Sequence, residues 1–132
     1  MTSNRDWAAL IGRILLSAIF IQTGFQKITD FAGNVAYAAK FGLPMPEAAI
    51  VVAIVVELGC GLMLLAGFRA RLAALAIAIF CIATAFVFHR YWTLPADKQL
   101  LDNIFFWKDL ALAGGMLTVF AFGPGRLSLD KA

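Results

Sequence analysis

The segment AAIVVAIVVELGCGLMLLAGF, residues 48–68, decides the fold class of this chain. Its one charged residue, Glu57, lies near the middle of a run that is otherwise apolar. A stretch of about 17–25 apolar residues is long enough to cross the hydrocarbon core of a bilayer as an α-helix. The segment therefore predicts a membrane-spanning helix with a carboxyl group at mid-depth.

The composition of the whole chain leads to the same class. Of its 132 residues, 62% are hydrophobic and 14% are charged, whereas about a quarter of the residues in a soluble domain are charged. A soluble domain of this composition would lack the polar residues to cover its surface. We expect a single domain over residues 1–132 with spans at about 7–27, 46–67, 70–90 and 103–122.

The longest connection, residues 26–46, is expected to contain a short helix. Asp30 can cap a helix over residues 31–41, and Pro46 suits the first turn of the next span. Such a helix could lie flat at the membrane surface. The predicted fold class is therefore all-α, a four-helix transmembrane bundle with a short interfacial helix between spans one and two.

The distribution of Lys and Arg predicts the orientation, because cytoplasmic segments carry an excess of these residues. One set of basic residues lies in short segments, and the other set is diluted by nearby acidic residues. We therefore expect both termini in the cytoplasm. The first set is Arg5, Arg69, Arg71, Arg126 and Lys131, and the second is Lys27, Lys40, Arg90 and Lys98.

A charge at the bilayer centre costs about 2.5–3.5 kcal/mol, so Glu57 is expected to face the bundle interior. Arg13 lies about four residues, or roughly 6 Å at helical rise, from the middle of span one, and a guanidinium can cover that offset. We therefore expect an Arg13–Glu57 pair. One stripe of span one is expected to face inward, with Gly24 as a point of helix contact. This stripe contains Arg13, Ser17, Phe20, Gly24 and Lys27.

Further polar residues are expected to gather in the outer half of the bundle, with Glu57 as the floor and Arg13 below it. We expect Gln22, Glu57 and Lys108 to face one another. These residues are candidates for a ligand site; alternatively, they hold the helices in register or reach the lipid headgroups. The outer group is Gln22, Gln26, Lys27, His89, Lys108 and Asp109.

Several chemistries fit the sequence poorly. A single His cannot provide bis-histidine haem ligation, and no metal-binding cluster, phosphate loop or GxSxG motif is present. Cys60 and Cys81 lie in separate spans outside any CxxC pair, and we interpret them as small buried apolar residues. The sequence therefore contains no recognisable catalytic motif, which favours a non-catalytic protein, and it predicts no metal site.

Short segments along almost the whole chain resemble the DoxX family of small four-helix bacterial inner-membrane proteins. They occur in the family's order and spacing. The segments are GRILLSAIFIQTGFQKITDFAG (12–33), FGLPMP (41–46), VELGCGLMLLAGF (56–68), FVFHRYW (86–92), FWKDLALAGG (106–115) and GPGRLSLD (123–130).

The resemblance implies a four-helix bundle in the inner membrane with cytoplasmic termini. Recurring polar residues of the family map onto Arg13, Glu57, His89 and Lys108, but no assigned catalytic residue can be transferred. The family name comes from similarity to a subunit of a thiosulfate:quinone oxidoreductase, and some members are linked to membrane thiol-oxidative-stress complexes. The lack of a cysteine pair in this chain argues against a direct thiol-redox role.

These observations leave hypotheses of different classes. The first is an accessory membrane subunit or a binder of a small quinone-like molecule that serves a redox system. The second is a small proton-linked transporter that uses Glu57, and the third is a structural anchor for a partner protein. Candidate partners are a membrane oxidoreductase and further copies of this chain, with no role for nucleic acid.

Overall fold

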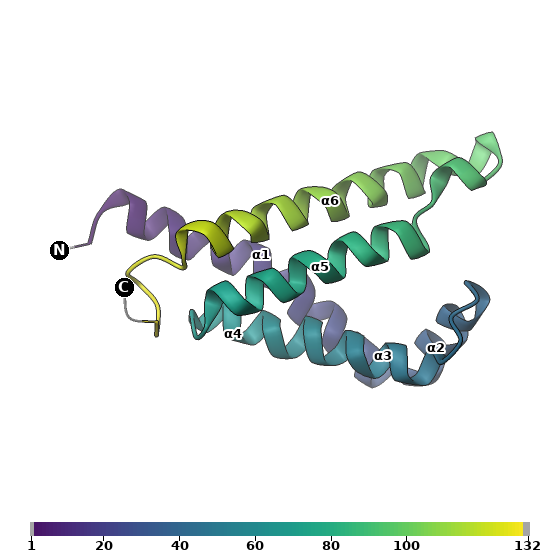
Figure 1. Ribbon diagram of the computed structural model, residues 1–132, viewed down its shortest axis with the longest axis horizontal. Helices are drawn as coiled ribbons and strands as arrows, with labels where there is room; N and C mark the ends of the chain where they lie inside the picture. The colour runs from purple at the N-terminus through teal and green to yellow at the C-terminus, as the bar shows by residue number, and fades with distance from the viewer. Residues whose placement is uncertain (1, 131–132) are drawn as a thin grey trace.

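The computed structural model describes residues 2–130, and the two ends of the chain lie at the same end of a bundle of long helices (Figure 1). Four helical stretches are long and apolar enough to cross a membrane, which confirms the predicted all-α membrane bundle. They are Asn4–Thr29, Pro46–Ala66, Ala70–Thr93 and Ala96–Phe122. We call the end with both termini the terminal end. Lys131, used in the orientation prediction, lies outside the described residues.

The second span is interrupted by a π-helical segment, η1, which joins α3 and α4. The short 3₁₀ turns η2 and η3 connect α5 to α6. The elements in order are α1 (Asn4–Thr29), α2 (Phe31–Lys40), α3 (Pro46–Ile54), η1 (Val55–Cys60), α4 (Gly61–Ala66), α5 (Ala70–Phe88), η2 (Tyr91–Thr93), η3 (Ala96–Lys98) and α6 (Gln99–Phe122).

Local sequence signals set the helix ends. Ser3 begins α1 in a capping box, in which its hydroxyl and the Asp6 carboxylate each accept a backbone N–H. The Asp30 carboxylate accepts the N–H of Gly33 and caps α2, which confirms the predicted interfacial segment as a helix. Pro46 occupies the first turn of α3, where its missing N–H leaves no hydrogen bond unmade.

The packed core lies in the terminal half of the bundle. The helices α5 and α6 lie side by side (Figure 1). Small residues on α5, such as Ala74 and Ala78, are fully buried and let the neighbouring helices approach closely. Leu64, Ile77 and Met116 fill the space between α4, α5 and α6.

The predicted inward stripe of α1 is confirmed. Arg13, Ser17, Phe20 and Gly24 are buried, and Lys27 is half-buried. A Cβ atom on Gly24 would lie 2.7 Å from the backbone nitrogen of Leu58. Gly24 is therefore the place where α1 touches η1, as the sequence predicted.

The predicted Arg13–Glu57 pair is wrong. The Arg13 guanidinium donates from Nη1 to the carbonyl oxygens of Leu64 and Leu65, at 3.1 Å each, and from Nη2 to the carbonyl of Leu127. The last carbonyl groups of a helix have no partner within that helix, and Arg13 lies beside those of α4. Arg13 has the depth to reach a carboxylate, but its guanidinium binds these backbone carbonyls instead.

The C-terminal tail completes this closure of the terminal end. The Asp130 carboxylate accepts the backbone N–H groups of Arg69 and Ala70, at 2.7 and 2.8 Å, and so caps α5 from a distant part of the chain. The Leu129 N–H donates to the carbonyl of Ala66 at 3.1 Å. Arg13 and the tail therefore provide hydrogen-bond partners for the last carbonyl groups of α4 and for the first N–H groups of α5.

Candidate ligand-binding site

A cavity of about 600 Å³ lies in the half of the bundle away from the termini. It exists because α5 packs against η1 and α4 but scarcely against α3. Its volume falls within the range of about 300–1,000 Å³ typical of small-molecule sites. Most of its lining is apolar, including Ile19, Phe20, Ile50, Ala53, Phe80, Val87 and Leu112.

One wall of the cavity carries a buried ion pair. Glu57 is 5% exposed. The Thr23 hydroxyl donates to its Oε1 at 2.6 Å. The Lys27 ammonium donates to Oε1 at 3.3 Å and lies 3.0 Å from Oε2, although no hydrogen bond is aligned with Oε2. The partner of Glu57 is therefore Lys27, one helix turn beyond Thr23 on α1.

Glu57 lies within the π-helical segment η1. A π-helical turn contains more residues than an α-helical turn, and such segments occur frequently at functional sites. The wider turn rotates the side chains of α4 around the helix axis relative to those of α3. Both α3 and Glu57 line the cavity, whereas Leu64 on α4 packs in the core.

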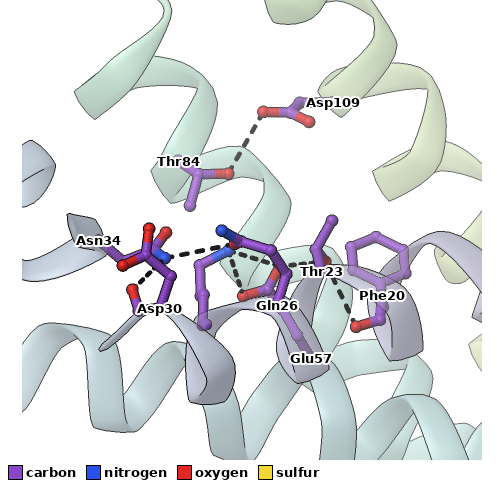
Figure 2. Close-up of polar contacts among 9 residues, drawn as sticks. Phe20, Thr23, Gln26, Asp30, Asn34, Glu57, Thr84 and Asp109 are labelled. Carbon is purple, nitrogen blue, oxygen red and sulfur yellow. Dashed lines mark hydrogen bonds and ion pairs between the residues drawn. The ribbon is translucent and has the colours of Figure 1, made fainter. Parts of the chain in front are cut away.

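The facing wall carries a second polar group from α5 and α6. The Thr84 hydroxyl donates to Oδ2 of Asp109 at 3.3 Å, and His89 Nε2 lies 3.9 Å from the same oxygen. The other ring nitrogen of His89 lies 3.4 Å from Oδ1 of Asp102. Figure 2 shows Thr84 and Asp109 on one side, with Thr23 and Glu57 on the other.

The helix α2 lies over the outer rim of the cavity. The Tyr37 ring stacks on Phe88 at a centroid distance of 5.7 Å, which joins α2 to the end of α5. Asn34 donates to Gln26 Oε1 at 3.3 Å (Figure 2). Burial, with a smaller effect from the charge of Asp102, raises the pKa of the Tyr37 phenol, which therefore stays protonated at neutral pH.

The cavity brings together only part of the predicted polar group. Lys27, Glu57, His89 and Asp109 line it. Gln26 is exposed and accepts a hydrogen bond from the rim residue Asn34. Arg13 lies in the terminal half of the bundle, away from the cavity. Whether any of these residues binds a ligand stays a prediction.

The expectation that Gln22, Glu57 and Lys108 face one another is wrong, because Gln22 and Lys108 are exposed outside the cavity. At 100° per residue, Gln22 lies about 200° from Phe20, on the other side of α1 from the buried stripe. Lys108 lies about 200° from the buried Phe106 for the same reason. Both residues have the predicted depth but the wrong face.

Thr23 and Thr84 also line the cavity, although neither was among the predicted site residues. A helical-wheel signal existed for Thr23, because it lies four residues before Lys27 and therefore on the same side of α1. Thr84 is the only polar side chain in residues 72–88 apart from Cys81. A lone hydroxyl in an apolar span was a detectable signal.

The family model for DoxX matches residues 8–90, from α1 through the end of α5. The chain belongs to the DoxX family. This family membership, together with the four apolar helices, makes it an inner membrane protein. The matched region contains Lys27, Glu57 and His89, whereas Asp109 and the C-terminal tail lie beyond it.

Several relatives share nearly the whole chain. It is 38% identical over 122 residues to the inner membrane protein YphA of Escherichia coli, covering 92% of this chain and 87% of YphA. It is 36% identical over 131 residues to the inner membrane protein YqjF of Escherichia coli, covering 99% of this chain and 95% of YqjF.

A more distant relative is the Surfeit locus protein 4 homolog of Schizosaccharomyces pombe. The identity is 24% over 131 residues, which is 98% of this chain but only 38% of that protein. No solved structure matches this DoxX-family chain.

Proposed function

We propose that this DoxX-family protein binds a small amphipathic molecule of quinone type and serves a membrane redox system as an accessory subunit. One observation carries the proposal: a largely apolar cavity of about 600 Å³ has the Lys27–Glu57 ion pair in its wall. Ligand sites combine such an apolar lining with a few fixed polar groups. A quinone-type molecule has the same division between a polar head and an apolar tail.

The polar head group would lie against the Lys27–Glu57 pair, and the apolar tail would lie along α3 and α5. The pair is pre-positioned for this role, because Thr23 holds Oε1 of Glu57 from the same helix that carries Lys27. The separation of α3 from α5 gives a long tail a route toward the surrounding lipid. The arrangement supports binding and orientation of the molecule.

Co-purification tests the proposal directly. The protein would be purified in mild detergent, extracted with organic solvent and analysed by mass spectrometry for bound quinone-type molecules. Ala83 is an exposed residue of α5 that lines the cavity, so Ala83→Phe places an aromatic ring inside the cavity. Ala111→Phe, on an exposed part of α6 outside the cavity, is the matched control.

We expect a bound quinone-type molecule at near-stoichiometric amounts in the wild type and in Ala111→Phe, and at least a tenfold lower amount in Ala83→Phe. Equal amounts in all three samples would mean that the molecule is carried by lipid-facing surfaces. Titration with a short-tailed benzoquinone separates absence of binding from loss during purification. A failure to bind in that titration would overturn the proposal.

A proton-linked transporter is a second candidate, favoured by the presence of a carboxylate on each facing wall, Glu57 and Asp109. Transport also requires a path through the terminal end of the bundle. In this structure Arg13 and the C-terminal tail close that end. Reconstituted liposomes distinguish the candidates. Flux that depends on a pH gradient and is lost in Glu57→Gln would favour the transporter.

A further inference from the structure

We infer that a second cavity, at the terminal end of the bundle, binds the phosphate group of an anionic phospholipid. The cavity has a volume of about 600 Å³. It is lined by the start of α1, the turn before α5 and the first residues of α5, the end of α6 and the C-terminal tail. We call it the terminal pocket. It shares no lining residue with the cavity beside Glu57, so the inference does not depend on the proposed function.

The C-terminal tail builds the terminal pocket. It returns to the end of the bundle where α1 begins (Figure 1). A Cβ atom on Gly125 would lie 2.8 Å from the Cβ atom of Ala9, so the tail packs directly on α1. The Asp130 carboxylate joins the tail to α5 by accepting the N–H groups of Arg69 and Ala70. The walls of the pocket are therefore held together by specific contacts.

Three arginines from different parts of the chain line the terminal pocket. Arg69 directly precedes α5, Arg71 lies in the first turn of α5, and Arg126 lies in the tail. All three residues are exposed. An arginine guanidinium presents a planar fork of donors that matches two oxygens of a phosphate group. Basic pockets between membrane helices bind lipid head groups by this chemistry.

Two of these guanidinium groups are positioned by their neighbours and keep donors for a ligand. The Arg69 guanidinium lies 5.8 Å from the ring centroid of Phe68, and its side chain donates no hydrogen bond to residues 2–130. The Arg71 guanidinium lies against the tail, because a Cβ atom on Gly123 would be 3.2 Å from its Nη2. Arg71 makes one long hydrogen bond, from Nη1 to the carbonyl of Ala121 at 3.4 Å. Since each guanidinium has five N–H donors, most of them are available to a ligand.

The carboxylates on the same lining neutralise the arginines only in part. The Asp6 carboxylate accepts hydrogen bonds from Ser3 and interacts electrostatically with Arg126. The Asp130 carboxylate accepts two backbone N–H groups at the start of α5. Three arginines and two aspartates give the lining a net formal charge of +1. A single phosphodiester group, with one negative charge, would balance it.

The apolar part of the lining favours a lipid over a soluble phosphate compound. Leu72 follows Arg71 on α5, and Phe122 ends α6; both line the terminal pocket and are 59% and 83% exposed. At the end of a membrane helix, apolar side chains contact acyl chains while arginine side chains reach the head groups. The phosphate of an anionic phospholipid would lie between the arginines, and its acyl chains would contact Leu72 and Phe122.

Native mass spectrometry of the full chain in detergent tests the inference. The delipidated protein is titrated with phosphatidylglycerol, which is anionic, and with phosphatidylcholine of the same acyl chains, which is neutral overall. We expect phosphatidylglycerol to bind about tenfold more tightly, because hydrogen bonds between charged groups change affinity by this factor or more. Equal affinity for the two lipids would overturn the inference.

Variants locate the binding in the terminal pocket. Arg69→Gln/Arg71→Gln removes two charges from the lining, and Arg5→Gln/Arg90→Gln removes two charges at exposed positions outside it as the matched control. We expect about tenfold weaker binding of phosphatidylglycerol in the first variant and unchanged binding in the control. Equal weakening in both would show a general effect of surface charge and overturn the inference. Arg71→Gln alone takes the place of the double variant if that variant does not fold.

Inorganic phosphate as a competitor distinguishes the two sources of a phosphate group. We expect phosphatidylglycerol to remain bound in a large excess of phosphate, because the lipid also gains from the apolar contacts with Leu72 and Phe122. Displacement of the lipid by an equal concentration of phosphate would assign the terminal pocket to a soluble phosphate compound and overturn the assignment to a lipid.

Discussion

The Lys27 ammonium lies 3.0 Å from Oε2 of Glu57 and joins the end of α1 to the π-helical segment η1 at the wall of the cavity. The two side chains are 20% and 6% exposed, so that neither charge is well solvated. A carboxylate in the middle of an apolar span is thus stabilised by a lysine from the preceding span. The pair has both a structural role and a place in the candidate site.

Lys27→Met should destabilise the protein, because it leaves the buried Glu57 carboxylate without its cation. The loss should be below the roughly 3–5 kcal/mol typical of breaking a fully buried pair, since Lys27 is partly exposed. The double variant Lys27→Met/Glu57→Gln should recover part of the loss. Thermal melts of the three variants in detergent measure this coupling.

The matched control for this coupling is Arg13→Leu combined with Glu57→Gln. Arg13 and Glu57 have separate hydrogen-bond partners, so their losses should add within about 0.5 kcal/mol. Strict additivity for Lys27 and Glu57 as well would show that these two residues do not act as a pair.

Arg13→Gln should loosen the terminal end, because the guanidinium joins α4 to the tail through the carbonyls of Leu64, Leu65 and Leu127. Each charged hydrogen bond contributes about 1.5–3 kcal/mol, so a loss of several kcal/mol is expected. The tail should also become sensitive to carboxypeptidase. Arg5→Gln, at an exposed position, is the control, and a tail equally protected in both variants would contradict this role of Arg13.

Asp130→Ala should cost about 0.5–2 kcal/mol, the usual range for the loss of a helix N-cap. The reason is that its carboxylate accepts the N–H groups of Arg69 and Ala70 at the start of α5. Asp97→Ala, in an exposed turn, should have little effect. Thermal melts compare the two, and similar losses at both positions would exclude a specific capping role.

Gly24→Ala and Gly12→Ala should have opposite effects although both lie inside α1. A Cβ at position 24 would lie 2.7 Å from the Leu58 backbone nitrogen and push α1 from η1, at a cost of about 1–3 kcal/mol. A Cβ at position 12 meets no atom within 4 Å, so alanine should stabilise the helix by up to about 1 kcal/mol. Equal melting temperatures would contradict the close contact at Gly24.

Much of the fold follows from the sequence because the bilayer imposes strong rules on composition and span length. The four spans, the cap at Asp30 and the inward stripe of α1 all depend on local patterns of this kind. Predictions that used depth without helical phase, as for Gln22 and Lys108, were wrong. The prediction for Arg13 was wrong because its side chain donates to backbone carbonyls.

The remaining features depend on tertiary packing and had no local signal. The capping of α5 by Asp130 joins residues about sixty positions apart, and a tail motif alone does not reveal its partner. The cavity exists because α5 and α3 separate, which depends on the packing of all helices. The pairing of Lys27 with Glu57 needed the close contact at Gly24 to set the register of α1 against η1.

Photo-crosslinking with a short-tailed azidoquinone tests the central claim most directly, namely that the cavity beside Lys27 and Glu57 holds a quinone-type molecule. After illumination and digestion, mass spectrometry identifies the labelled residues. We predict labels within residues 19–27 and 80–89, lost in the presence of excess unlabelled quinol and in Ala83→Phe. Labels spread over exposed apolar residues such as Leu15 and Leu72, with no competition by the quinol, would contradict the claim.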